Sequence, residues 1–241
     1  MPKKTFELDP EDMAVPRRPK ELASWVAERC EVLGMSLEAK SYARSGDPLP
    51  KKFYEEVRPL AIYAEAMYED FDDVMVIPNL GNENYDGTVI LPDGKKIFVE
   101  ITSAKDGYSD SLRMEMLQKD GRVNAIGPVT VSGKRRSVER KINVSDDAVD
   151  HNHLVGEHLA LVAIRMCAKA NPKYGPDHVL LVAVDDYIAF RAEPDINRLR
   201  GLVSVLVRTL PLEFQAVAMV GQSDRVLFEI EVPKGTSKNA L

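Results

Sequence analysis

Residues 85–102 read YDGTVILPDGKKIFVEIT, two runs rich in β-branched and aromatic residues around a Pro-Asp-Gly turn. This pattern predicts a β-hairpin, because Pro and Gly suit turn positions and the flanking residues suit a pleated sheet. A three-residue loop with Gly94 in the left-handed conformation pairs Leu91 with Lys95. The same register, continued along both strands, sets Asp86 opposite Glu100.

Asp86 and Glu100 would then share one face of the sheet, with Cβ atoms roughly 5 Å apart. Two carboxylates at that distance repel each other unless a positive charge lies between them, and a divalent cation is the natural candidate. A two-residue Asp93-Gly94 loop would instead place the two acids on opposite faces unless a bulge intervened. Turn chemistry favours the three-residue loop. Two ordinary acids on a solvated hairpin are the simpler alternative, but Glu100 lies in an apolar run, where an unpaired acid is costly.

The composition is that of a folded globular protein, with 241 residues, 44% of them hydrophobic and 29% charged. A net charge of -6 argues against coating nucleic acid by bulk electrostatics, but it leaves a metal-dependent nuclease open. The two cysteines, without CxxC spacing, predict reduced thiols and no disulfide framework. The sequence has no apolar stretch of about 18 residues and no signal-peptide pattern, so we expect a soluble cytoplasmic protein with no membrane partner.

The periodicity of apolar residues predicts one mixed central β-sheet flanked by helices, an α/β fold. We expect an N-terminal arm and helix at residues 1–50, with residues 1–18 as a loose arm or strap. The α/β domain would span 51–233, with a basic insert at about 122–145, and a disordered tail would follow at 234–241. Within this order Ser109 is expected to cap a helix that ends near Gly121, and Asp146 or Asp147 a long helix that ends near Ala170.

The hairpin resembles the PD-(D/E)xK nuclease superfamily, which has the restriction-endonuclease-like fold. In that family an acid begins the second strand, and an acid-x-Lys tripeptide lies on the third strand. Asp86 matches the first acid and Glu100 the second. The resemblance covers roughly residues 53–120. It implies a restriction-endonuclease-like core with extra N-terminal helices, and an endonuclease that hydrolyses phosphodiester bonds, in DNA because the superfamily mostly acts on DNA.

The resemblance also implies a bound Mg²⁺ or Mn²⁺. Asp86, Glu100 and the backbone carbonyl of Ile101 would be its ligands, because hard divalent ions prefer oxygen donors. A helix before the hairpin often adds an acid, here Glu65 or Glu69, with Glu65 preferred because it lies deeper in the helix. The ion would lower the pKa of a water molecule and neutralise charge on the scissile phosphate.

The family's lysine is replaced by Thr102, and Tyr85 stands where the family often has Pro. Thr102 can donate a hydrogen bond but cannot supply a cation. Lys105 would take over the lysine's role, or Gln118 or Lys119 would replace it from the next helix. The missing lysine also supports the alternative of a catalytically inactive nuclease fold, which would be a nucleic-acid-binding or assembly module, for example in a homodimer.

Several basic residues are candidate contacts to a nucleic-acid backbone. Arg113 could bind a phosphate bidentately, or it could form a salt bridge on a solvated helix face. The insert carries Lys134, Arg135 and Arg136 in an otherwise acidic chain, and this patch is either a phosphate-binding surface or a charged loop. The pair Asp185-Asp186 follows an apolar run, a position typical of a strand-end turn or a helix cap. The two acids could also line the pocket of a small-molecule enzyme, but no sequence motif supports that function.

Overall fold

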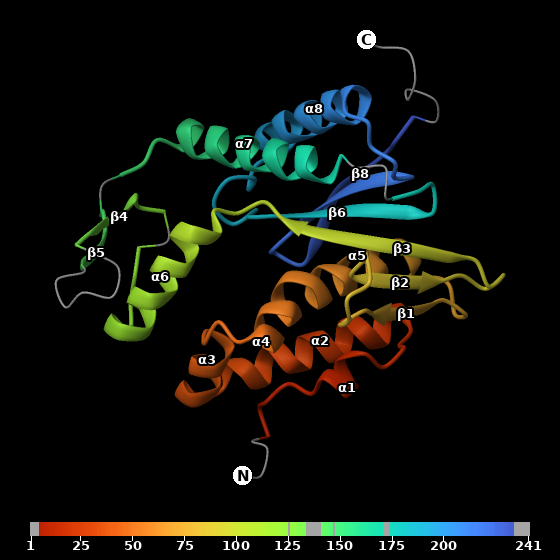
Figure 1. Cartoon of the computed structure of the whole chain (residues 1–241), viewed down its shortest axis with the longest axis horizontal. Coiled ribbons are helices and arrows are strands. Elements are labelled where there is room, and N and C mark those ends of the chain that lie inside the picture. Colours follow the sequence, from red (N-terminus) through yellow and green to blue (C-terminus); the bar gives the residue numbers. More distant parts are fainter. Residues whose placement is uncertain (1–4, 125, 134–140, 147, 171–173, 234–241) are drawn as a thin grey trace.

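The computed structural model describes residues 5–124, 126–133, 141–146, 148–170 and 174–233. Their main feature is a six-stranded mixed sheet in the order β1-β2-β3-β6-β7-β8 (Figure 1). The first three strands form an antiparallel meander, β3, β6 and β7 run parallel, and β8 returns antiparallel to β7. The α/β fold with a mixed central sheet is therefore confirmed. The strands are β1 (Met75–Pro78), β2 (Gly87–Ile90), β3 (Lys96–Ser103), β6 (His178–Val184), β7 (Ala216–Gly221) and β8 (Arg225–Glu231).

Helices cover both faces of this sheet and form two apolar cores. One face packs against α2 (Pro19–Gly34) and α5 (Arg58–Tyr68), the other against α7 (His151–Lys169) and α8 (Glu193–Thr209) (Figure 1). Strand β6 alternates between the two, because Leu181 belongs to the first core and Leu180 to the second. Glu100 is the partner of Leu180 across β3 and β6, so its side chain faces α7.

The hairpin between β2 and β3 has the expected three-residue loop. Gly94 has a φ of 83°, and the Leu91 N–H donates to the Lys95 carbonyl at 2.8 Å. The ladder ends with the pair of Gly87 and Val99, and the Val99 carbonyl also accepts from the Asp86 N–H at 2.8 Å, so the regular register does not continue to a pair of Asp86 and Glu100. The hairpin nevertheless brings Asp86 near Glu100, because the Asp86 Oδ2 accepts from the N–H of Ile101, the next residue.

A π-helical turn, η1 (Phe53–Val57), joins α4 (Pro48–Lys52) to α5. The Arg58 N–H reaches back to the Phe53 carbonyl, and Pro59 has no N–H to offer the Glu55 carbonyl. The wider turn accommodates this missing donor while Phe53 and Val57 stay buried. Such turns are frequent at functional sites, and this one carries Glu55 and Glu56.

The N-terminal segment is packed rather than loose. Leu8 and Met13 are buried against the first core, and Asp12 binds both Arg17 and Trp25. Residues 5–18 therefore form a strap packed on the core rather than a loose arm, the second of the two expected alternatives. The short helices of this region are α1 (Pro10–Met13) and α3 (Leu37–Ala43).

Two predicted helix caps are wrong. Helix α6 (Gly107–Asp120) is capped by Asp106 rather than Ser109, and α7 is capped by Asp150, a few residues after the predicted acids. The insert forms the second hairpin, β4 (Val129–Ser132) with β5 (Lys141–Val144). The predicted basic contacts Lys134, Arg135 and Arg136, and the tail 234–241, lie outside the described residues. No helix in the described ranges is both long and apolar enough to cross a membrane.

Candidate active site

The site lies where β3 continues beyond the start of β2. The N–H groups of Phe98 and Ala104 donate to the carbonyls of Asp177 and Ala183, each at 2.8 Å, so even-numbered residues of β3 bond toward β6. Backbone groups alternate in direction along a strand, so those of Ile101 and Ser103 point to the opposite edge, which β2 does not cover. The Ile101 carbonyl therefore faces this open edge.

Asp86 bonds to β3 at this point through both its backbone and its side chain. Its N–H donates to the Val99 carbonyl at 2.8 Å, and its Oδ2 accepts from the Ile101 N–H at 2.7 Å. Burial raises the pKa of Asp86, and the charge of Glu100 raises it further, against the lowering effects of the Ile101 bond and of Lys169 and Lys52. Asp86 is thus held within electrostatic range of Glu100.

Glu100 is almost fully buried, with 6% of its surface exposed, and it forms an ion pair with Lys169 at the end of α7. The Tyr174 hydroxyl lies beside it, and burial together with the charge of Glu100 raises the pKa of Tyr174. A buried carboxylate without a partner would be very costly. Lys169 is therefore the cation that permits an acid in the centre of this sheet.

The helix acid beside Asp86 is Glu56 on η1, in place of the predicted Glu65. The Glu56 Oε2 is buried and accepts no hydrogen bond within the described chain, although the Lys52 Nζ lies 3.8 Å away. Burial raises the pKa of Glu56 to about 7, with the charge of Asp86 as the next cause. Glu65 lies about two and a half helical turns further on, which puts it on the opposite, exposed side of the helix. Glu69 is exposed and pairs with Lys20.

The donor set fits a hard divalent cation by its chemistry. Asp86 is electrostatically coupled to both Glu56 and Glu100, the Ile101 carbonyl faces the open edge, and the Glu56 Oε2 accepts no hydrogen bond from the described residues although it pairs with Lys52. Over the described ranges, however, no three Asp, Glu, His or Cys side chains are gathered tightly enough to hold an ion, and Glu100 is bound to Lys169. The arrangement has carboxylates that repel each other, and a cation would relieve that repulsion.

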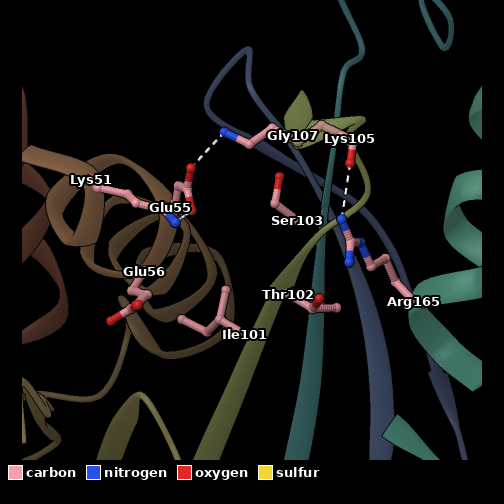
Figure 2. A pocket seen from close by; sticks show the side chains of 9 residues that line it. All are labelled: Lys51, Glu55, Glu56, Ile101, Thr102, Ser103, Lys105, Gly107 and Arg165. Atoms are coloured by element: carbon pink, nitrogen blue, oxygen red, sulfur yellow. Dashed lines mark hydrogen bonds and ion pairs between the residues drawn. The ribbon is translucent and has the colours of Figure 1, made fainter. Parts of the chain in front are cut away.

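The predicted replacements for the family lysine lie in a neighbouring cavity. Thr102 and Lys105 both line a cavity of about 270 Å³ at the end of β3 (Figure 2). The Lys105 Nζ is 2.7 Å from Glu55 Oε1, so this cation is already engaged. Gln118 donates to the Arg44 carbonyl. The cation beside Glu100 is Lys169, which no spacing rule connects to the hairpin.

The remaining candidate residues have structural partners. Arg113 pairs with Asp110 at 3.3 Å and donates to the Gly127 carbonyl at 3.0 Å, in agreement with its reading as a salt-bridge residue. Asp185 accepts from two successive N–H groups in a turn. Asp186 is buried and binds Ser223 and Arg225. The acids after β6 therefore stabilise the fold.

The comparisons with known proteins add no relative to this picture, because no family model, no curated protein and no solved structure matches the chain.

Proposed function

We propose that this protein is a metal-dependent nuclease with a restriction-endonuclease-like core, which hydrolyses phosphodiester bonds in DNA. The observation that carries the proposal is the proximity of Asp86 and Glu100 at the point where β2 begins and β3 continues past it, with the Asp86 carboxylate bound to the Ile101 N–H and within electrostatic range of Glu100. A third acid, Glu56, comes from the helix before the meander. This order of acids is the one that the resemblance to PD-(D/E)xK nucleases implies.

Each residue near the open edge has a role in this proposal. Asp86, Glu100, Glu56 and the Ile101 carbonyl would hold Mg²⁺ or Mn²⁺. The ion, when bound, supplies an acidified water and neutralises charge on the phosphate. Lys169 takes the role of the missing family lysine, because its ammonium lies beside Glu100, where it can donate to the attacking water or to the phosphate. Thr102 lies on the same strand face as Glu100, so its hydroxyl can orient that water.

The metal site is tested by thermal unfolding with EDTA and with millimolar MnCl₂ or MgCl₂. A ligand that binds only the folded protein raises Tm, by about 2.7 kcal/mol of stability at a hundred times its Kd. We expect Asp86→Asn and Glu56→Gln to abolish the metal-induced shift. The exposed acids Asp72 and Glu65 supply matched controls, Asp72→Asn and Glu65→Gln, which should retain it. Equal shifts in all four variants would refute the site.

Catalysis is tested by cleavage of single- and double-stranded DNA with and without metal. We expect wild-type protein to cut only with metal, and Lys169→Met to lose cleavage while retaining the metal-induced rise in Tm. The Lys105→Met variant should lose less activity than Lys169→Met, because Lys105 pairs with Glu55 and not with a proposed metal ligand.

A second function, a catalytically inactive module that binds nucleic acid, is favoured by one observation. Thr102 replaces the family lysine, and the Glu100–Lys169 pair already satisfies the buried acid without an ion. On this alternative, DNA would bind equally well in EDTA and in Mn²⁺, and no product would form under either condition.

A further inference from the structure

The cavity at the end of β3 is lined by two of the proposed metal ligands, Glu56 and Ile101, and also by cations and hydroxyl-bearing residues that a metal site does not explain. It lies between η1 and α7 and measures about 270 Å³, slightly below the roughly 300–1,000 Å³ of drug-sized ligand pockets. Figure 2 shows Glu55 on the helix to one side and Arg165 from α7 on the other, while the carboxylate of Glu56, which also lines the cavity, points away from Arg165. Its size suits a small group rather than a whole base pair.

Arg165 is the cation of this cavity with the most unused donors. Its Nη2 donates to the Lys105 carbonyl at 3.0 Å, while its Nε is buried and donates to no group in the described ranges. No described carboxylate pairs with its guanidinium. A buried donor without an acceptor is costly, so an acceptor from a ligand would be stabilising. Arg165 lies one turn before Lys169 on α7 and hence on the same helix face.

The rest of the lining adds positive charge and hydroxyl donors. Glu55 faces two ammonium groups, with Lys105 Nζ at 2.7 Å and Lys51 Nζ at 3.9 Å. Thr102 and Ser103, each of which carries a hydroxyl group, also line the cavity. The lining carries three cations, Lys51, Lys105 and Arg165, against two carboxylates, Glu55 and Glu56, and an excess of positive charge favours a bound oxyanion.

We propose that this cavity binds a phosphate group, held by Arg165 and Lys51 with Thr102 and Ser103 as further donors. A guanidinium matches two phosphate oxygens at once, whereas an ammonium acts as a point charge. The inference deepens the proposed function and rests on it for the identity of the substrate. Thr102 follows Glu100 by two residues on β3. The phosphate in the cavity would therefore be a neighbour of the scissile phosphate on the same strand.

The test measures anion binding in EDTA, so it does not depend on the metal site. The probes are a fluorescein-labelled single-stranded 12-mer, followed by anisotropy, and inorganic phosphate, followed by the rise in Tm at constant ionic strength. We expect Arg165→Gln to weaken binding of the 12-mer about tenfold, equivalent to roughly 1.4 kcal/mol, and to remove the phosphate-induced shift. The control is Arg208→Gln, an exposed arginine on α8, which should match wild type.

The two probes distinguish the sources of the phosphate. Loss of both signals in Arg165→Gln supports a nucleic-acid backbone as the ligand. Loss of the inorganic-phosphate signal alone supports the cavity with a free phosphate or phosphomonoester as its ligand. Unchanged binding of both probes overturns the proposal, even if metal binding and cleavage are found. Conversely, a protein whose Tm does not rise with metal can still bind phosphate in this cavity. The metal-site proposal and the phosphate-site proposal can therefore be refuted independently.

A second variant distinguishes a role of Arg165 in phosphate binding from a role in folding. Lys51 is mostly exposed, with 65% of its side chain accessible, so Lys51→Gln should leave Tm unchanged while weakening both probes. If Arg165→Gln fails to fold and Lys51→Gln binds as wild type does, the proposal is overturned. In the cleaving enzyme, we expect Arg165→Lys to raise KM more than it lowers kcat, because it keeps the charge and loses the bidentate geometry.

Discussion

Glu56 carries the most unusual single group of the site, a half-buried carboxyl with one oxygen that accepts no hydrogen bond from the described residues. Its pKa rises from an ordinary value of 4.5 to about 7, by burial first and by the charge of Asp86 second. Below pH 4.5 the carboxyl is protonated in the folded and unfolded states alike. Between pH 4.5 and 7 the unfolded chain releases the proton first, so folding becomes less favourable as the pH rises.

Glu56→Gln should therefore stabilise the protein at high pH and not at low pH. In EDTA we expect its Tm to exceed that of wild type at pH 8, by about 2–4 °C for each kcal/mol relieved, and to converge with wild type near pH 4. The measurement is Tm against pH for both proteins, with Glu65→Gln as the exposed control. Parallel curves for wild type and Glu56→Gln would show that Glu56 does not titrate in this way.

The individual residues of the site differ in how far the sequence could predict them. Asp86 and Glu100 belong to one hairpin, where loop length and strand alternation predict that they lie close together but not the irregular step by which the Asp86 N–H bonds to the Val99 carbonyl. Lys169 reaches Glu100 from a helix far along the chain, and only the packing of α7 on the sheet brings them together. Glu56 was missed because Glu65 was preferred for lying deeper in the helix, whereas the acid near Asp86 lies in the π-helical turn that precedes it.

At the scale of elements, the loop of the β2–β3 hairpin sets the register on which the site depends. Gly94 adopts a φ of 83°, whereas Gly201 lies within α8. A Cβ at either position would meet no atom within 4 Å, so backbone conformation is the main difference between them.

The same substitution should therefore have opposite effects at the two glycines. We expect Gly94→Ala to destabilise the protein by about 1–2 kcal/mol, the cost of a left-handed conformation with a Cβ. Gly201→Ala should stabilise it by about 0.5–1 kcal/mol, because alanine favours the helix. Urea unfolding of both variants measures this. The same sign for both would contradict the left-handed conformation of Gly94 in the hairpin loop.

At the scale of the whole molecule, the site lies at the seam between the two apolar cores. Glu56 comes from the side of the first core, while Lys169 and Arg165 come from α7 on the second. The sequence predicted most of the elements and the mixed sheet, because these follow from local periodicity. It could not predict that β6 lies beside β3, which decides that α7 covers Glu100.

The overall charge of the molecule bears on how strongly nucleic-acid binding should depend on salt concentration. A chain with a net charge of -6 cannot attract DNA by its total charge, so binding must come from a few local cations. For single strands, each phosphate contact contributes about -0.7 to the slope of log K against log salt. In EDTA, Arg165→Gln should make the slope shallower by about 0.7.

Replacing Lys134, Arg135 and Arg136 together with alanine should make the slope shallower by roughly 2 if all three contact the nucleic-acid backbone. Slopes equal to wild type in both variants would place the binding surface elsewhere on the molecule.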